Sequence, residues 1–421
     1  MLLQFNFKNY KSFKDDVTLD LTATKITEFS NHVVSIANDK VLPVSAIFGA
    51  NASGKSNVYE AFRFMAMYTI FSFEYGGSTE ESKVVDRTLK TTPFLFDSNS
   101  KNAESSFEIF FIDNDDPKEK TYNYGFSLDQ NRITEEWLNV RAKTSKGEFK
   151  RIFYRSLTEK DLSGIPTKSR ENINVALQDE TLIVSLGSKL KVKELSFVRD
   201  WFLKCECTNF GNTIENYILS SMLPNNFAND RNVQKKVIKY LSAFDPSIID
   251  FVVKKIEVDN DEYYSVMAVH KMIDSNDTES IPLKDESSGT QKMFTLYQKF
   301  HDALESGGTL FIDELNARLH PLLVRSILVM FLNPEINTNK AQLIFTTHDA
   351  WQLSNNLLRR DEIWFTDKDE RGVSTLYSLA DFVDEDGVKI RKDESYEKNY
   401  LLGKYGAIPS LKYLDMLLEE K

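Results

Sequence analysis

Apolar and polar residues alternate along several segments of the chain, and the period of the alternation changes along its length. A period of two predicts β-strands at residues 2–7, 17–21, 106–112, 122–128 and 149–154. From about 158 to 245 the apolar spacing becomes mostly helical, and strand-like runs return at 251–258 and 263–270. The pattern therefore predicts a mixed α/β protein that combines an antiparallel region with a mostly helical insertion.

Residues 49–56 read GANASGKS and lie between an apolar run at 44–48 and a helix-like run at 57–65. This order of strand, loop and helix with the pattern G-x-x-x-x-G-K-[ST] is typical of a phosphate-binding loop. Glycines let the backbone N–H groups of the loop turn toward phosphate oxygens, and the helix N-terminus adds partial positive charge. We expect Lys55 at the β- and γ-phosphates and Ser56 on Mg²⁺. The predicted ATP-binding residues of the loop are Gly49, Asn51, Ser53, Gly54, Lys55, Ser56 and Asn57.

Two further apolar runs end in residues that suit phosphoryl chemistry. The run at 309–312 is followed by Asp313 and Glu314, and the run at 341–347 is followed by His348. Ligands of parallel sheets collect at the carboxyl ends of the strands. We expect Asp313 to hold Mg²⁺ through water and Glu314 to orient or deprotonate the attacking water. His348 is expected to reach the γ-phosphate.

Composition narrows the class of protein. The chain has 421 residues, 41% of them hydrophobic, which is enough for a packed core in about two or three domains. The longest apolar runs are shorter than the roughly 18 residues of a membrane span, and the N-terminus lacks a signal-peptide layout, so we expect a soluble cytosolic protein. A net charge of −11 argues against a generally basic nucleic-acid binder, although a local basic groove stays open. Cys205 and Cys207 are too few for structural zinc and are expected to be reduced thiols.

The order of these motifs resembles that of ABC-type ATPases of the SMC and RecF kind. The segments that carry the resemblance are the phosphate loop, SSGTQ at 287–291, FIDE at 311–314, NARLHP at 316–321 and TTHD at 346–349. The NYKSF segment at 9–13 is also similar to the N-terminal strand of that family. More narrowly, the insertion and the tail at 400–409 resemble the RloA and AbiLi ATPases and the ATPase of PARIS systems, which act in phage defence.

The resemblance implies an ABC-type ATPase head, in which a mixed sheet with a phosphate-loop core is joined to an antiparallel β-subdomain and a mostly helical insertion. It assigns Ser288, Gly289 and Thr290 to the signature motif, which completes the ATP site of the opposite subunit in a head-to-tail homodimer. Residues 317–320 match the loop between the two sites, with His320 where many relatives carry Asp. That family usually has a Gln after the loop helix, but none occurs here, and a polar substitute is expected near residues 94–99.

We expect four regions from these boundaries. They are an N-terminal ATPase lobe at 1–157, a helical insertion at 158–245, a C-terminal ATPase lobe at 246–385 and a tail at 386–421. The tail either packs on the core or docks a partner.

The implied function is an ATP- and Mg²⁺-dependent sensor and scaffold of an antiviral abortive-infection system. In that reading it forms a homodimer or a higher oligomer, controls a separate Toprim-type nuclease effector and responds to a phage-encoded trigger. The alternative is a RecF- or SMC-like DNA-repair ATPase that clamps DNA, which needs a basic surface. A combined ATPase and nuclease of the OLD kind would need a Toprim domain, for which the sequence after His348 is too short. The insertion and the unusual signature disfavour a transporter motor.

Overall fold

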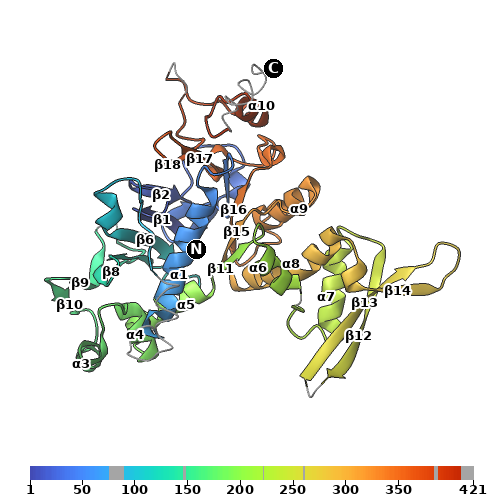
Figure 1. The fold of residues 1–421 in the computed structure, drawn as a ribbon, viewed down its shortest axis with the longest axis horizontal. Coiled ribbons are helices and arrows are strands. Elements are labelled where there is room, and N and C mark those ends of the chain that lie inside the picture. Colours follow the sequence, from blue (N-terminus) through green and yellow to red (C-terminus); the bar gives the residue numbers. More distant parts are fainter. Residues whose placement is uncertain (75–89, 146–147, 221, 259–260, 384–386, 409–421) are drawn as a thin grey trace, which may run out of the picture.

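The computed structural model describes residues 1–74, 90–145, 148–220, 222–258, 261–383 and 387–408. A seven-stranded antiparallel sheet forms one lobe, here called the antiparallel lobe (Figure 1). Its strands in spatial order are β10 (Lys160–Asp161), β9 (Lys150–Ser156), β8 (Ile133–Arg141), β7 (Thr121–Leu128), β6 (Ser105–Ile112), β1 (Leu2–Lys8) and β2 (Val17–Asp20). The mixed α/β class and the antiparallel subdomain predicted from the sequence are thereby confirmed.

A second, six-stranded sheet carries the phosphate loop, and it is parallel except for its last strand. Its strands in spatial order are β11 (Glu206–Asn209), β15 (Thr309–Asp313), β16 (Gln342–Thr347), β5 (Val44–Gly49), β17 (Ile363–Lys368) and β18 (Ser374–Ser378). Every residue of β5, β15 and β16 is buried, as expected for strands covered on both faces. Alternate residues along these strands therefore enter two different hydrophobic cores.

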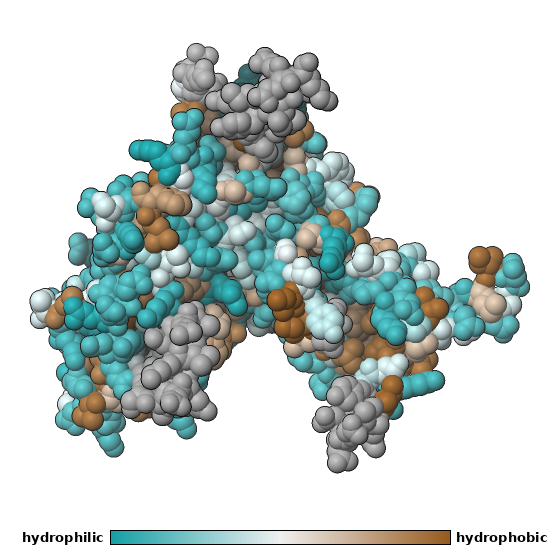
Figure 2. All heavy atoms as spheres, in the orientation of Figure 1, coloured by the Kyte–Doolittle hydropathy of each residue, from teal (hydrophilic) through white to brown (hydrophobic). Residues whose placement is uncertain are grey.

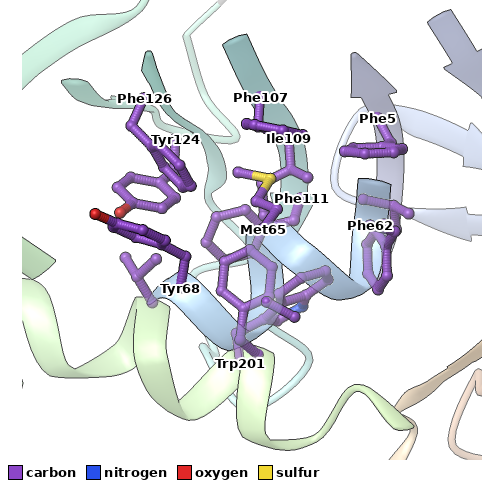
Figure 3. Packing of buried hydrophobic residues seen from close by; sticks show 14 of the residues in the cluster. Phe5, Phe62, Met65, Tyr68, Phe107, Ile109, Phe111, Tyr124, Phe126 and Trp201 are labelled. Atoms are coloured by element: carbon purple, nitrogen blue, oxygen red, sulfur yellow. The ribbon is translucent and has the colours of Figure 1, made fainter. Parts of the chain in front are cut away.

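Helix α1 (Lys55–Phe71) lies between the two sheets and joins their cores. Phe62 packs edge-on against Phe5 of the antiparallel lobe at 5.4 Å between ring centroids (Figure 3). It also meets Phe311 of β15 at 5.7 Å. Met65 and Trp201 extend the same cluster. Such aromatic pairs contribute about 0.5–1.5 kcal/mol each beyond the area they bury. The helix that begins at the phosphate loop is thus fixed along its length.

The helical segment at 158–245 differs from the single insertion expected from the sequence. It contains α3 (Thr167–Ala176), α4 (Ile183–Lys189), α5 (Lys193–Leu203), α6 (Thr213–Ser220) and α7 (Arg231–Leu241). Helices α4 and α5 bury Ile183, Leu195 and Phe202 in the core of the antiparallel lobe, and β11 pairs with β15 inside the parallel sheet. The apolar faces of these elements thus complete existing cores, so the segment is divided between both lobes and is not one separate unit.

The part that projects from the molecule is a three-stranded antiparallel sheet, here called the arm (Figure 1). It consists of β12 (Ile248–Val258), β13 (Asp261–Lys271) and β14 (Thr278–Pro282). Helix α7 packs against β12, and α8 (Ser288–Ser306) leads from the arm back to β15. Figure 2 shows an open notch between the arm and the antiparallel lobe.

The remaining elements lie outside the three sheets described above. They are β3 (Val34–Ile36), β4 (Asp39–Val41), α9 (Pro321–Leu332), α10 (Tyr396–Leu401) and 3₁₀ turns at Ser30–His32, Ser72–Glu74, Ser100–Asn102, Leu283–Asp285, Ala350–Gln352 and Arg360–Glu362. Tyr400 and Tyr405 pack on Phe365 of β17 at 5.6 and 5.4 Å, so the tail packs on the core as far as it is described. No helix within the described ranges is long and apolar enough to cross a membrane. Both cysteines are free, and burial raises the pKa of Cys205 to about 12.

A buried ion pair fixes the connection before β17 to the N-terminal segment. Arg359 has no exposed side-chain surface, and its guanidinium donates to both carboxylate oxygens of Asp361 at 2.8 and 2.7 Å. It also donates to the backbone oxygen of Glu28 at 2.6 Å, and Thr24 N donates to Asp361 at 2.9 Å. The pair therefore joins two segments that are far apart in the sequence.

We predict that Arg359→Met lowers the free energy of unfolding by about 3–5 kcal/mol, because it leaves the Asp361 carboxylate buried without its counter-charge. Arg371→Met is the matched control, since Arg371 is 84% exposed and its surface pair with Asp369 is worth at most about 1 kcal/mol. Urea denaturation of both variants measures the difference. Equal shifts in the two midpoints would contradict this assignment.

Candidate functional site

The side chain of Lys55 folds back onto the phosphate loop and hydrogen-bonds to its backbone. Lys55 Nζ donates to the backbone oxygens of Gly49 and Ala50 at 2.8 Å each, so the ammonium lies within the loop. Burial lowers the pKa of Lys55, and the charges of Asp313 and Glu314 oppose that shift. A lysine held in this place is available to phosphate oxygens that replace its backbone partners.

Side chains of β17 and β18 lie so close to two glycines of the loop that neither position has room for a Cβ atom. A Cβ on Gly49 would lie 2.5 Å from Thr366 Oγ1, and one on Gly54 would lie 2.7 Å from Ser374 Oγ. Gly54 also has a φ of 115°, in the left-handed region that favours glycine. The loop is thus shaped by both backbone conformation and lack of space.

Hydroxyl groups from distant strands hold the loop in place. Ser53 Oγ lies 2.6 Å from Thr366 Oγ1, and Ser374 Oγ donates to the backbone oxygen of Ser53 at 2.7 Å. Asn57 Nδ2 donates to Ser12 Oγ at 2.7 Å, which ties the 9–13 segment to the start of α1. Thr366 and Ser374 were not predicted, because a single hydroxyl on a strand carries no signal in the sequence.

Asp313 and Glu314 follow β15 and share one partner on β16. Thr346 Oγ1 donates to Asp313 Oδ1 at 2.5 Å and accepts from Glu314 N at 2.9 Å. Burial raises the pKa of Asp313, while hydrogen bonds from Thr346 and Ser56 and the charge of Lys55 oppose the shift. The structure therefore places Ser56, Lys55 and the two acidic residues close together at one edge of the parallel sheet.

Ser56 and Asp313 fit a magnesium ion bound together with a nucleotide. They supply a hydroxyl and a carboxylate oxygen, and Mg²⁺ prefers oxygen ligands of which only one or two come from the protein. The carboxylate is buried and its pKa is raised by that burial, so a divalent cation beside it would offset the cost of its charge.

The Glu314 carboxylate rests against a glycine that the sequence did not single out. A Cβ on Gly211 would lie 2.7 Å from Glu314 Oε2, so a side chain at residue 211 would require this carboxylate to shift. Glu314 itself has a φ of 56°, which is uncommon for a residue with a side chain. The left-handed backbone of Glu314 and the lack of a side chain at Gly211 thus both favour this position of the carboxylate.

His348 lies at the end of β16 and is exposed. Its Nε2 is 3.2 Å from Asn316 Nδ2, and Asn316 Oδ1 accepts from Thr347 Oγ1 at 2.8 Å. The histidine is thus held beside the loop that follows Glu314. Among the described residues, no hydrogen bond joins it to the phosphate loop. Asn51 lies on the exposed outer side of that loop.

The predicted signature residues form the first turn of α8. Ser287 caps the helix by accepting from Thr290 N at 3.1 Å, and Thr290 Oγ1 donates to Asp245 at 3.1 Å. Thr290 is buried, and its N–H and its hydroxyl both donate hydrogen bonds within the chain. Ser288 is exposed, and a Cβ on Gly289 would meet nothing closer than 3.8 Å. In the described part of this single chain, no hydrogen bond joins this turn to the phosphate loop. Ser288 and Gly289 are thus open to another molecule.

Two remaining expectations concern single positions. His320 caps α9, because its Nδ1 accepts from Leu322 N at 3.2 Å. Within 94–99, Asp97 accepts from Ser100 N at 2.9 Å and lies 3.5 Å from Lys14. Within the described residues, the hydrogen bonds of 94–99 include those to Asn9 and Ser100 and none to Ser56 or Asp313.

Comparison with known proteins identifies the class. The sequence profile of the family described as "AAA domain, putative AbiEii toxin, Type IV TA system" matches residues 44–350. This stretch is most of the chain and includes the loop, the signature turn, Asp313, Glu314 and His348, so the protein belongs to that family and carries its AAA-type ATPase domain. No curated protein matches the chain.

Several solved structures are distantly similar to this chain in the arrangement of their helices and strands. An SMC head bound to the C-winged helix domain of ScpA is 14% identical, with a TM-score of 0.40 and coverage of 90% of this chain and 97% of the other. RecF in a complex named RecF-ATPrS is 11% identical, with a TM-score of 0.31 and coverage of 89% and 98%. RecF with ATP is 12% identical, with a TM-score of 0.31 and coverage of 89% and 97%.

The shared hydroxyl of Thr346 gives a prediction. Thr346→Val removes the partner of both Asp313 and the Glu314 N–H without changing the shape of the side chain, so we expect the free energy of unfolding to fall by about 1.5–3 kcal/mol. Thr208→Val on β11 is the control, because the hydroxyl of Thr208 is buried and has no hydrogen-bond partner among the described residues. Chemical denaturation compares them. A loss as large in Thr208→Val would show that the effect is not due to the shared hydrogen bonds.

Proposed function

We propose that the protein is an ABC-type ATP hydrolase. The observation that carries the proposal is the meeting of Lys55, Ser56, Asp313 and Glu314 at the carboxyl edge of β5 and β15. Lys55 would bind the β- and γ-phosphates, with the backbone N–H groups of the loop. Magnesium held by Ser56 and Asp313 would supply charge stabilisation for the phosphates. Glu314 would orient or deprotonate the attacking water, and His348 would contact the γ-phosphate.

The active form that we propose is a homodimer with two composite ATP sites. The support is that Ser288 and Gly289 begin a helix, are open to contact and lack hydrogen bonds to the loop of their own chain. A helix N-terminus with a serine hydroxyl suits a terminal phosphate. Each nucleotide would then lie between the loop of one subunit and the signature turn of the other.

For the hydrolytic step we predict that Glu314→Gln keeps ATP binding but slows turnover by about 10²-fold or more, the usual size of general-base assistance. Lys55→Ala should abolish binding. Because bound ATP favours the assembled state by mass action, Glu314→Gln should form a stable dimer with ATP, and Ser288→Arg should prevent it.

Turnover assays, equilibrium nucleotide binding and light scattering measure these effects. Hydrolysis by Glu314→Gln at the wild-type rate would refute the role of this carboxylate. A monomer whose mass does not respond to ATP would refute the composite site.

The biological role that we propose is that of a sensor and scaffold in an antiviral abortive-infection system. The description of its family, which names a putative AbiEii toxin and a toxin–antitoxin system, supports this setting. In the proposal, the ATP-bound assembly holds a separate Toprim-type nuclease inactive, and a phage-encoded trigger shifts the assembly toward release. Such a switch needs a partner that binds the two states with different affinity.

We predict that the purified chain alone cuts neither DNA nor RNA with ATP and Mg²⁺, and that its expression alone does not stop growth. Co-purification from its native cells followed by mass spectrometry should recover a Toprim-type nuclease. Nuclease activity that co-elutes with the single chain and disappears in Lys55→Ala would instead show a self-contained enzyme. Salt-dependent DNA binding by the closed Glu314→Gln dimer would favour the DNA-clamping alternative.

A further inference from the structure

The turn between β11 and α6, at residues 209–212, lies between two parts of the candidate site. On one side it contacts the residues that follow β15, and on the other it contacts a lysine of α8. The first turn of α8 carries Ser288 and Gly289. Neither function nor family assigns a role to this turn.

Lys292 is the residue of α8 that meets the turn, and only 9% of its surface is exposed. Its Nζ lies 3.5 Å from the centroid of the Phe210 ring and donates to Asn216 Oδ1 at 2.8 Å. The amide nitrogen of Asn216 in turn donates to the backbone oxygens of Phe210 and Asn212, at 2.5 and 2.9 Å. One ammonium thus holds both the ring and the backbone of the turn.

The opposite side of the turn positions the acidic pair. Phe210 N donates to the backbone oxygen of Asp313 at 2.9 Å, and the Glu314 carboxylate rests against Gly211. Asn209 Oδ1 accepts from the N–H groups of Gly211 and Asn212 at 2.8 and 3.0 Å, which keeps the turn tight. A displacement of Phe210 would therefore move the surface on which Glu314 lies.

We infer that Lys292 is a positioning residue for Glu314, acting through Phe210, Asn216 and Gly211. Because Lys292 belongs to the helix that begins at Ser288, the same contacts couple the two ATP sites of the proposed dimer. A terminal phosphate from the partner subunit that engages the start of α8 would bias the position of Glu314 in the chain that supplies that helix. The inference rests on the proposed function, since it assigns a role in ATP hydrolysis.

The charges around Lys292 provide a readout that a purely structural role would not give. Lys292 and Arg318 line one cavity together with Ser288, and Glu215 is the acidic group that acts on Lys292. Burial lowers the pKa of Lys292 to about 7, Arg318 acts in the same direction and Glu215 opposes it. The ammonium therefore loses its proton as the pH rises through neutrality, while an arginine at this position would stay charged.

The test uses the full chain and four single substitutions. Lys292→Met keeps the apolar stem without the charge, Lys292→Arg keeps the charge, and Gly211→Ala moves the carboxylate without touching Lys292. Lys299→Met is the matched control, because Lys299 lies two turns further along α8 and pairs with Glu206. For each we propose measuring kcat, KM, equilibrium binding of a slowly hydrolysed ATP analogue and the melting temperature.

We expect Lys292→Met and Gly211→Ala each to lower kcat about tenfold or more and to change nucleotide affinity less than about twofold. The kcat of the double variant should be no lower than that of the more impaired single variant, because both changes act on one carboxylate. Lys292→Arg should recover most of the rate, and Lys299→Met should match wild type. The wild-type kcat should fall as pH rises through about 7, and Lys292→Arg should lack that decrease.

Four outcomes would overturn the inference. They are a wild-type kcat in Lys292→Met, additive losses in the double variant, no recovery in Lys292→Arg, and a loss in Lys292→Met that follows a lowered melting temperature. Glu314→Gln separates this inference from the proposed function. If Glu314→Gln hydrolyses ATP normally, the proposed function fails, whereas a slow Glu314→Gln together with a normal Lys292→Met refutes only the positioning role.

Discussion

The register of three parallel strands determines whether the candidate site exists. Phe48 of β5 pairs with Thr347 of β16, and Phe345 of β16 pairs with Ile312 of β15, so the three strands end together. Because the side-chain period of a strand is two, a slip by one residue would move each side chain of the strand from one hydrophobic core to the other. The apolar residues on both faces of this sheet thus fix the register. The polar residues that follow the strands meet as a consequence.

Burial gives the site its stability and also sets its electrostatics. Asp313 and Lys55 are both buried. Burial raises the pKa of Asp313 and lowers the pKa of Lys55, so it favours the neutral form of each. Each charge therefore depends on the partners that the fold supplies, above all the hydroxyl of Thr346 and the backbone oxygens of the loop. A phosphate and a divalent cation would stabilise both charges more fully than these neutral partners do. The same packing that orders the loop thus favours ligand binding.

The phosphate loop, the acidic pair and His348 could be singled out from the sequence, because each belongs to a contiguous motif with its own spacing, and their roles stay predictions. The sequence did not predict Gly211, Thr366 or Lys292, because their roles come from contacts between segments far apart in the sequence. The helical insertion shows the same limit. Periodicity indicated mostly helical structure from about 158 to 245, but it does not say that α4 and α5 pack into the core of the antiparallel lobe. Where a face packs is a tertiary property.

The loop that follows β15 shows how one short segment can serve two sites. Glu314 and Arg318 both have positive φ, and the turn between them is fixed by hydrogen bonds from Leu315 N to Thr346 O and from Ala317 N to Glu314 O. Left-handed backbone at residues other than glycine costs free energy and persists only where the surroundings impose it. Here β16 imposes it at one end of the loop, and the cap of α9 by His320 holds the other. The backbone from Glu314 to Arg318 is thus held at both ends, and Arg318 lines one cavity with Lys292 of α8, so the loop places Glu314 and a residue next to α8 on one fixed segment.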